Sequence, residues 1–359
     1  MFSKNALLSR KILYKKFFNK FDLVKEFFRF SGSFLLNKSK QPLAISLMIT
    51  SVCNNNCKMC FEKKSLNKNK NLPFLEKKII KKLISQIKKR KTLIFITGGE
   101  PFLHPNIWQI LKLFKNKNIF VSICTNGTCL KTKDIKKLSK TQLSSIMFSI
   151  HGTKKTHDKI TNNKGSFNKI IKNIKQIKEE TKIPVFVNYA ILPNNITDML
   201  KTIKICEKLK VNAIRFQHLN FLTKKELNQH YKLFNKKHQV EQYISDKTQL
   251  PPRRILKQVK KINNKSFDIP IFFLPNLNEI EIKKWYSDFF STKRKCFFPF
   301  REIFIDFNAN VYPCRTIRYK LGNLKEEKLK KIFNNKKAIY FRKKIKKKLP
   351  PGCNRCCRL

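Results

Sequence analysis

Short apolar segments alternate with amphipathic segments along the chain between residues 43 and 220. The apolar segments have the length and the β-branched content of strands, and they cover residues 43–50, 92–97, 119–125, 145–150, 184–192 and 213–219. Between them apolar residues recur at helical spacing near residues 74–89, 106–115, 131–139, 167–180 and 196–209. This alternation predicts an α/β fold, in which a parallel sheet curls into a partial (β/α)6 TIM-like barrel. Periodicity alone does not separate this barrel from a flat, doubly wound sheet.

The remaining segments differ from this pattern and predict the domain boundaries. Residues 1–41 form a basic, Phe-rich amphipathic segment, which we expect to pack on the barrel or to lie on an anionic membrane surface. The predicted barrel core spans residues 42–220, and residues 221–292 form a helical connection with a strand at 269–274. Residues 293–359 form a small α+β domain, in which two short strands at 303–307 and 311–314 precede a basic helix face at 342–348.

Composition excludes some classes of protein. The chain has 359 residues, of which 41% are hydrophobic, so it can bury a core and is not disordered throughout. No apolar stretch reaches the about 18 residues that span a bilayer, and lysines interrupt the first forty residues where a signal peptide would be apolar. We therefore expect an intracellular, cytoplasmic protein.

The formal net charge is +58, from 80 Lys and Arg against 22 Asp and Glu. Clustered cations are typical of nucleic-acid binding, because they neutralise phosphates. Here the cations are spread over the whole chain, Lys, Asn, Ile and Phe are abundant, and Gly is scarce. A general bias in composition is therefore favoured over a nucleic-acid interface, which would be local.

The cysteines are grouped rather than scattered, and in an intracellular protein they indicate metal ligands rather than disulfides. Cys53, Cys57 and Cys60 begin three residues after the first strand. Three thiolates on one loop suit an iron–sulfur cluster or zinc. Because the loop contains no fourth Cys or His, a cluster with one open iron is the better interpretation.

A second group lies near the C-terminus. Cys296 and Cys314 flank the predicted hairpin, and Cys353 and Cys356 follow a helical stretch. Four convergent thiolates suit a fully ligated 4Fe–4S cluster or zinc, and Cys357 is a spare thiol that could replace Cys356. The isolated cysteines are interpreted as small buried apolar residues, and these are Cys124, Cys129 and Cys206.

Half of the 8 glycines follow predicted strands two, three and four, and these are Gly98, Gly99, Gly127 and Gly152. In parallel α/β folds the carboxyl ends of the strands carry the active site, and glycine allows the backbone to approach a ligand closely. The first cysteine group lies at the same edge of the sheet. The sequence therefore predicts one site there.

These motifs resemble those of the radical SAM superfamily. The spacing from Cys53 to Cys60 is the CxxxCxxC hallmark of that family, and residues 98–101 are similar to its GGEP motif. Residues 125–127 are similar to its TNG turn, and residues 149–152 with 157–158 resemble its S-x-D/H-G and H-D motifs. Residues 293–359 resemble the shortened SPASM domain, sometimes called Twitch, which binds an auxiliary cluster.

The resemblance implies a set of roles for individual residues. Cys53, Cys57 and Cys60 would hold a 4Fe–4S cluster whose open iron binds S-adenosylmethionine, and Cys296, Cys314, Cys353 and Cys356 would hold a second, auxiliary 4Fe–4S cluster. The backbone of Gly98 and Gly99 and the Glu100 side chain would receive the methionine amino group, as acceptors suited to an amine. Ser149, Asn188 and Met59 would contact other parts of the same cofactor. Relatives often carry an Arg after the H-D pair, where this chain offers only Lys164.

The implied activity is that of a radical SAM oxidoreductase. Such an enzyme reductively cleaves S-adenosylmethionine to a 5′-deoxyadenosyl radical, which abstracts a hydrogen atom from the substrate. We expect oxidative modification of a peptide or protein, or of a small metabolite, with the auxiliary cluster as electron acceptor and an external flavodoxin- or ferredoxin-like reductant. The alternatives are a radical SAM enzyme that modifies RNA and a non-enzymatic, zinc-binding nucleic-acid module.

Overall fold

The computed structural model describes residues 34, 37–38, 41–60, 62, 74–87, 92–233, 240, 242–245, 251–287 and 289–359. The amphipathic segment predicted within residues 1–41 lies almost wholly outside the described residues. No described helix has both the length and the apolar character that crossing a membrane requires.

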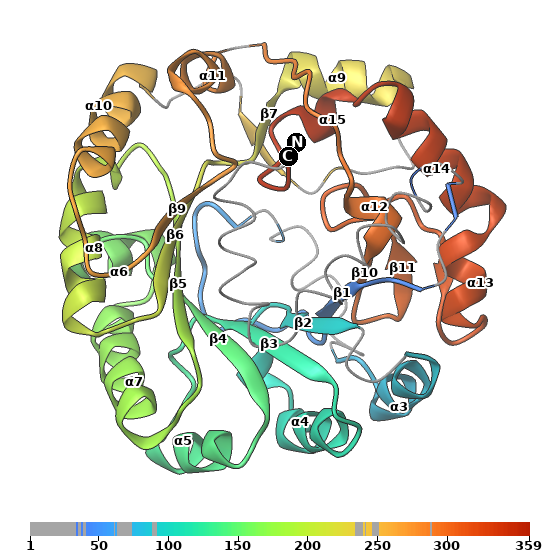
Figure 1. Cartoon of the computed structure of the whole chain (residues 1–359), viewed down its shortest axis with the longest axis horizontal. Coiled ribbons are helices and arrows are strands. Elements are labelled where there is room, and N and C mark those ends of the chain that lie inside the picture. The colour runs from blue at the N-terminus through green and yellow to red at the C-terminus, as the bar shows by residue number, and fades with distance from the viewer. Residues whose placement is uncertain are drawn as a thin grey trace.

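The six strands expected from the sequence are present, each within two residues of its predicted ends. They are β1 (Ala44–Met48), β2 (Leu93–Thr97), β3 (Phe120–Thr125), β4 (Leu143–Ser149), β5 (Val185–Ala190) and β6 (Ala213–Gln217). Neighbouring strands from β1 to β6 pair in parallel and in sequence order. Figure 1 shows that the sheet curls around a centre, so the barrel is confirmed over the flat alternative.

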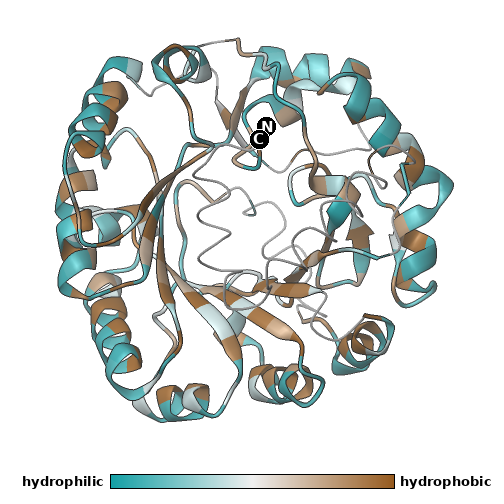
Figure 2. Cartoon of the chain, in the orientation of Figure 1, coloured by the Kyte–Doolittle hydropathy of each residue, from teal (hydrophilic) through white to brown (hydrophobic). Residues whose placement is uncertain are grey.

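Helices cover the outside of this curled sheet (Figure 1). The expected ones are α3 (Lys77–Gln86), α4 (Ile107–Asn116), α5 (Thr132–Ser139), α7 (Ser166–Glu180) and α8 (Met199–Lys208). The structure adds α6 (Lys154–Thr161), which the periodicity did not predict, and the short turns η2 (Pro101–Leu103) and η3 (Ile196–Asp198). Figure 2 shows brown strands inside and teal on the helix faces turned outwards, as amphipathic packing requires.

The sheet extends beyond the six predicted strands at both edges. The strand β9 (Ile271–Leu274) of the connection pairs in parallel with β6, and β10 (Glu302–Ile305) pairs in parallel with β1. The strands β11 (Asn310–Tyr312) and β12 (Gly322–Asn323) continue antiparallel from β10. All five residues of β1 are buried, so this strand needs a neighbour on each side. The C-terminal segment therefore shares one sheet with the barrel.

The connection and the C-terminal segment contain the remaining elements. These are β7 (Phe221–Thr223), α9 (Lys224–Leu233), β8 (Tyr243–Ser245), α10 (Pro252–Asn263), α11 (Glu279–Trp285), α12 (Phe298–Arg301), α13 (Leu329–Asn334), α14 (Lys336–Lys347) and α15 (Pro351–Asn354). The prediction of a solvated face at 342–348 is wrong for Arg342. Its side chain is buried, donates to the Pro299 carbonyl at 2.8 Å and lies over the Phe333 ring.

Alternation along the strands separates two apolar regions. Residues such as Ile146 and Phe148 of β4 belong to the large core that includes residues of the surrounding helices. The intervening residues form a second cluster of Met147, Phe186, Ala213 and Phe272, against which Phe95 and Cys124 pack. Because side chains along a strand point alternately to its two faces, this cluster is the apolar floor of the barrel interior. Polar residues stand above it at the carboxyl ends of the strands.

Candidate functional site

The first cysteine group lies in the loop that follows β1. All three thiols are partly exposed. Burial raises the pKa of Cys57 to about 12, and the nearby Cys60 and Cys53 thiols raise it further. Burial also raises the pKa of Cys53 to about 11, with contributions from Glu100 and Cys60. Thiols that oppose one another's ionisation lie close together, and a bound metal would replace their protons.

Backbone hydrogen bonds clamp this loop on two sides. From the end of β2, the Gly99 N–H donates to the Thr50 carbonyl at 2.9 Å and the Glu100 N–H donates to the Val52 carbonyl at 2.7 Å. On the other side, the amides of Asn56 and Lys58 donate to carbonyls at the end of α6, each at 3.1 Å. The helix that the periodicity missed therefore helps to position the cysteines.

The paired glycines allow this close approach. A Cβ atom on Gly99 would lie 2.1 Å from the Val52 carbonyl oxygen, and one on Gly98 would lie 2.6 Å from that of Thr50. Contacts this short do not occur in folded proteins, so any side chain here would displace the cysteine loop. The sequence assigned Gly98 and Gly99 to cofactor binding, and the structure adds a packing role that also requires glycine.

Glu100 is the buried centre of the rim, by which we mean the edge of the sheet at the carboxyl ends of its strands. Its side chain has no exposed surface. One carboxylate oxygen accepts from Thr125 Oγ1 at 2.7 Å and from the Phe102 amide at 3.1 Å, and the other accepts from the Asn126 amide at 2.7 Å. Burial raises the pKa of this carboxyl to about 7. The structure thus brings Glu100 to the rim and engages both of its oxygens with protein donors that join the turns after β2 and β3.

Asn126 is a residue of this rim to which the sequence assigned no role, although the TNG motif contains it. Its side-chain amide donates to Asn54 Oδ1 at 2.8 Å and lies 4.0 Å from the Cys53 sulfur. Cys129 follows in the same loop and is partly exposed, and its pKa responds to the Cys53 thiol and the Glu100 carboxylate. The interpretation of Cys129 as a buried apolar residue is therefore wrong, whereas Cys206 does lie buried on α8.

Ser149 and Asn188 are neighbours at the carboxyl ends of β4 and β5, where they pair in register. The Ser149 side chain bonds to the Cys124 thiol, and Asn188 Oδ1 accepts from Arg215 Nε at 3.0 Å. Met59 is partly exposed in the turn between Cys57 and Cys60. The structure therefore places Ser149 and Asn188 together and Met59 on the cysteine loop.

The histidine and aspartate of the H-D pair stabilise the fold. His157 Nδ1 accepts from the His151 amide at 3.1 Å. The Asp158 carboxylate accepts from the amides of Gly165 and Phe167 at 2.7 and 2.9 Å, which secures the start of α7. Lys164 is exposed in the same turn.

The second cysteine group converges around the start of α12, the end of β11 and α15. Cys296 and Cys314 pack against the buried Cys353 in one apolar cluster. Burial raises the pKa of Cys296 to about 12, with a contribution from Cys314, and the nearby Cys296 thiol contributes to the raised pKa of Cys356. The Cys357 thiol hydrogen-bonds with that of Cys356, which lowers the pKa of Cys357 to about 6, and Asn220 Nδ2 lies 3.8 Å from its sulfur. Cys357 therefore lies beside the second cysteine group.

One arginine connects the two cysteine groups. Arg315 follows Cys314 directly, and its Nε donates to Glu62 at 2.6 Å, whose other carboxylate oxygen accepts from Arg318 at 3.2 Å. The pKa of Arg315 responds to the Cys60 and Cys124 thiols as well as to Glu62. Arg315 therefore lies near members of both cysteine groups.

The two cysteine groups have the donor chemistry of iron–sulfur sites. Thiolate is the ligand that these clusters require, and the thiols of each group are near enough to act on one another's pKa. In the described part of the chain, no group of three or more His, Cys, Asp and Glu side chains is arranged to hold a single metal ion.

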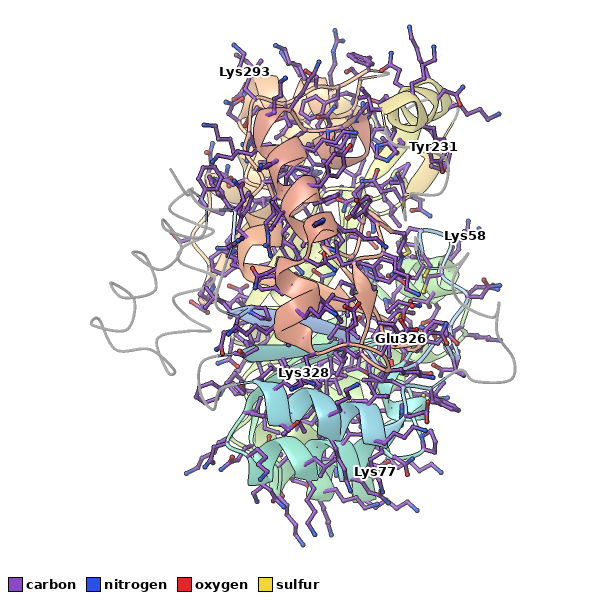
Figure 3. All side chains as sticks on the ribbon, turned by 90° about the vertical axis from the view of Figure 1, so that its right-hand side faces the viewer. Lys58, Lys77, Tyr231, Lys293, Glu326 and Lys328 are labelled. Atoms are coloured by element: carbon purple, nitrogen blue, oxygen red, sulfur yellow. The ribbon has the colours of Figure 1, made fainter. Side chains whose placement is uncertain are left out.

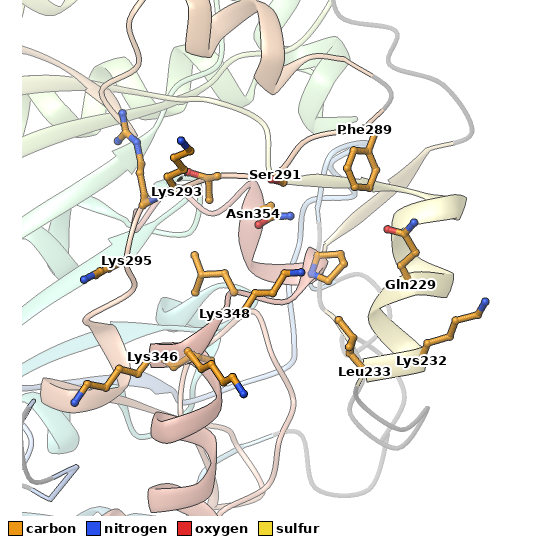
Figure 4. Close-up of a pocket in the computed structure, with 16 residues that line it drawn as sticks. Gln229, Lys232, Leu233, Phe289, Ser291, Lys293, Lys295, Lys346, Lys348 and Asn354 are labelled. Carbon is orange, nitrogen blue, oxygen red and sulfur yellow. Dashed lines mark hydrogen bonds between the residues drawn. The ribbon is translucent and has the colours of Figure 1, made fainter.

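A basic pocket lies beside the second cysteine group. It has a volume of about 670 Å³, and Lys232, Lys293, Lys295, Lys346 and Lys348 are among the residues that line it. Figure 4 shows these lysines coming from separate segments around one hollow. Its apolar residues Ile345 and Leu349 also contact the cluster that contains Cys353.

Comparison with known proteins adds independent findings. The model of the radical SAM superfamily matches residues 47–206, and that of SPASM, an iron–sulfur cluster-binding domain, matches residues 296–357. The chain is 25% identical to the Fe-coproporphyrin III synthase of Methanosarcina barkeri over 243 residues. This alignment covers 67% of this chain and 57% of that protein. Over 167 residues it is 34% identical to the cysteine-type anaerobic sulfatase-maturating enzyme of Clostridium novyi, covering 40% of this chain and 44% of that protein. The chain thus spans about half the length of these curated relatives.

The fold is also that of a solved structure. Streptococcus suis SuiB, crystallised with the precursor peptide SuiA, aligns with a TM-score of 0.64 at 15% sequence identity. The alignment covers 90% of this chain and 72% of SuiB.

Proposed function

The chain belongs to the radical SAM superfamily and carries a C-terminal SPASM domain, and from this premise we propose that it oxidatively modifies a peptide or protein side chain. A small metabolite is the second substrate class. The observation that carries the proposal is that Arg315 lies near both thiol groups, since a second group close to the first offers a place for the electron that such an oxidation releases.

Each thiol group has an assigned cofactor in this proposal. Cys53, Cys57 and Cys60 hold a 4Fe–4S cluster that leaves one iron for S-adenosylmethionine, and Cys296, Cys314, Cys353 and Cys356 hold the auxiliary 4Fe–4S cluster. When bound, the first cluster supplies one electron for cleavage of S-adenosylmethionine, and the 5′-deoxyadenosyl radical released removes a hydrogen atom from the substrate.

The chain's own residues position these groups and protect them. The turn from Gly98 to Glu100 holds the cysteine loop against the barrel edge. In this proposal the Gly98 and Gly99 carbonyls accept from the methionine amino group. Ser149 and Asn188 offer polar contacts on the neighbouring strands. The floor formed by Met147, Phe186, Ala213 and Phe272 keeps water from below, which protects a reactive radical.

The names of the relatives support both substrate classes. The Clostridium novyi relative is a sulfatase-maturating enzyme, so its substrate is a protein. Its sequence identity to this chain is the higher of the two. The Methanosarcina barkeri relative is a synthase of Fe-coproporphyrin III, a small molecule. We place peptide or protein first, because the relative with the higher identity is the sulfatase-maturating enzyme.

The first electron comes from an external reductant of flavodoxin or ferredoxin type. The +58 formal charge of the chain favours a partner with an acidic surface.

RNA modification is the second candidate and is less favoured. A nucleic-acid path would need cations concentrated towards the cysteine rim. Figure 3 instead labels Lys293 at one end of the molecule, Lys77 at the other and Lys58 at one side. This spread supports a general bias in composition.

The test uses protein reconstituted anaerobically with iron and sulfide. We expect about eight irons per chain and release of 5′-deoxyadenosine from S-adenosylmethionine with dithionite. The triple variant Cys53→Ala/Cys57→Ala/Cys60→Ala should retain about four irons and release none, while the control Cys206→Ala should match the wild type. About four irons in an active wild type would show that the auxiliary cluster is absent. Bound zinc in place of iron, without cleavage of S-adenosylmethionine, would overturn the proposal.

A further inference from the structure

Arg215 is a cation in the barrel interior that the proposed chemistry does not use. It lies on β6 between Ala213, which belongs to the apolar floor, and Gln217. Its side chain is partly buried. It pairs in register with Asn188 of β5, so it stands above the floor at the height of the predicted cofactor contacts.

The hydrogen-bond partners of the Arg215 side chain are neutral groups. Nε donates to Asn188 Oδ1 at 3.0 Å, and Nη2 lies 2.9 Å from the Met147 sulfur. A thioether is a weak acceptor, and a guanidinium carries five N–H donors, so most of its donor capacity is unused. Among the residues that the structure describes, Arg215 forms no ion pair with a carboxylate.

No carboxylate among the described residues balances this charge, and thiols are the nearby groups that favour it. Burial and the neighbouring Arg358 lower its pKa, while the Cys357 and Cys124 thiols act in the opposite direction. Arg315 and Arg318, by contrast, share the Glu62 carboxylate. Placing an unpaired charge in a protein interior is costly unless a ligand completes it.

We propose that Arg215, oriented by Asn188, binds a carboxylate of the substrate inside the barrel. The guanidinium fork presents two parallel donors that match a carboxylate, a geometry that lysine lacks. This inference rests on the proposed function, because it places the substrate inside the barrel, near the two cysteine groups.

The methionine carboxylate of S-adenosylmethionine is the other carboxylate that Arg215 could bind. That carboxylate would bind at the open iron, close to Cys53, Cys57 and Cys60. Arg215 Nη2 instead lies 2.9 Å from the sulfur of Met147, a residue of the apolar floor. We therefore assign Arg215 to a substrate that enters the barrel, and the test below distinguishes the two carboxylates.

The test measures carboxylate binding by the reconstituted holoenzyme. Propionate is titrated against thermal unfolding, with propionamide and sodium chloride at matched ionic strength as the neutral and ionic controls. We expect Arg215→Met to weaken propionate binding about tenfold or more, and Arg215→Lys to weaken it less. The double variant Lys293→Gln/Lys348→Gln, in the basic pocket of Figure 4, should bind propionate as the wild type does.

Further readouts separate the possible failures. S-adenosylmethionine binding by Arg215→Met is measured separately from propionate binding. A tenfold loss of S-adenosylmethionine binding would assign Arg215 to the cofactor and overturn the inference. Propionate binding no stronger than that of chloride, or equal in Arg215→Met, would also overturn it. Failure of the proposed function would show separately, as absence of cleavage by the wild type.

Discussion

At the residue scale, the rim depends on one buried carboxylate. Glu100 sits where the turns after β2 and β3 meet, and it accepts hydrogen bonds from Phe102, Thr125 and Asn126. Sequence reasoning assigned its oxygens to an incoming amine. In the structure they satisfy buried protein donors, so Glu100 acts on the site through the loops that it joins.

We predict that Glu100→Ala destabilises the protein and loosens the first cysteine group. Three donors would lose their acceptor, and each buried unsatisfied group costs about 1–3 kcal/mol. The free energy of unfolding in urea should fall by about 3 kcal/mol or more, and the reconstituted protein should retain less iron. Glu179→Ala, at an exposed position of α7, is the matched control. Equal stability and iron content in the two variants would contradict this role.

Buried histidines predict how stability depends on pH. Burial lowers the pKa of His151 to about 3, of His157 to about 4 and of His218 to about 3. Unfolded histidines titrate near 6.5, so below that pH the unfolded chain binds protons that the folded chain does not. The stability that these groups contribute is therefore complete above pH 6.5 and is lost as the pH falls towards 4.

His218→Gln isolates one of these histidines. Glutamine keeps an oxygen that can accept from the Tyr286 hydroxyl, which lies 2.7 Å from His218 Nδ1. The slope of unfolding free energy against pH between 6 and 4.5 should decrease by about 1.4 kcal/mol per pH unit. An unchanged slope in chemical-denaturation curves would show that His218 is protonated in the folded protein.

At the element scale, the cysteine loop is held by its neighbours. The end of β2 and the end of α6 supply the backbone partners of residues 50–58. These contacts join residues about fifty positions apart for β2 and about a hundred for α6, and only the folded chain brings them together. The paired glycines are the sequence signal of one of these contacts.

We predict that Gly99→Ala displaces the cysteine loop. The added Cβ would lie 2.1 Å from the Val52 carbonyl oxygen, which is backbone and cannot rotate away. Gly165→Ala is an informative control, because its φ of +79° strains alanine while the added Cβ meets no atom within 4 Å. The control should lose about 1 kcal/mol of stability and keep its iron. Gly99→Ala should lose the first cluster, measured as iron content and 5′-deoxyadenosine release, and full retention would refute the packing role.

At the scale of the whole molecule, the C-terminal segment completes the barrel. Its strand β10 covers the edge of β1, and its last residues bind the connection. The fully buried Arg355 donates to Glu226 of α9 and to the carbonyls of Trp285 and Ser287. The boundary predicted at residue 293 is therefore crossed by a strand pairing and by a buried ion pair.

We predict that Arg355→Met lowers the free energy of unfolding by about 3–5 kcal/mol, because Glu226 would remain buried without its cation. The double variant Arg355→Met/Glu226→Gln should regain part of this loss, since no unpaired charge remains and the glutamine oxygen can still accept from a buried amide. Urea denaturation of the wild type, the two single variants and the double variant gives the coupling energy. A double variant no more stable than Arg355→Met would argue against a net cost of the unpaired carboxylate.

The sequence by itself determined the strands, their parallel order and the two cysteine groups. Local periodicity sets each strand, and motif spacing within a loop is a local property. It also identified Gly98, Gly99 and Glu100, although it assigned them to ligand contacts alone.

Only the tertiary structure decided the role of α6, the engagement of Glu100 and the position of Arg215 beside Asn188. It also decided that β9 and β10 extend the barrel and that Arg342 is buried. Each of these depends on contacts between residues far apart in the chain. Such contacts follow from how packed elements satisfy buried polar groups and strand edges, which no local pattern encodes.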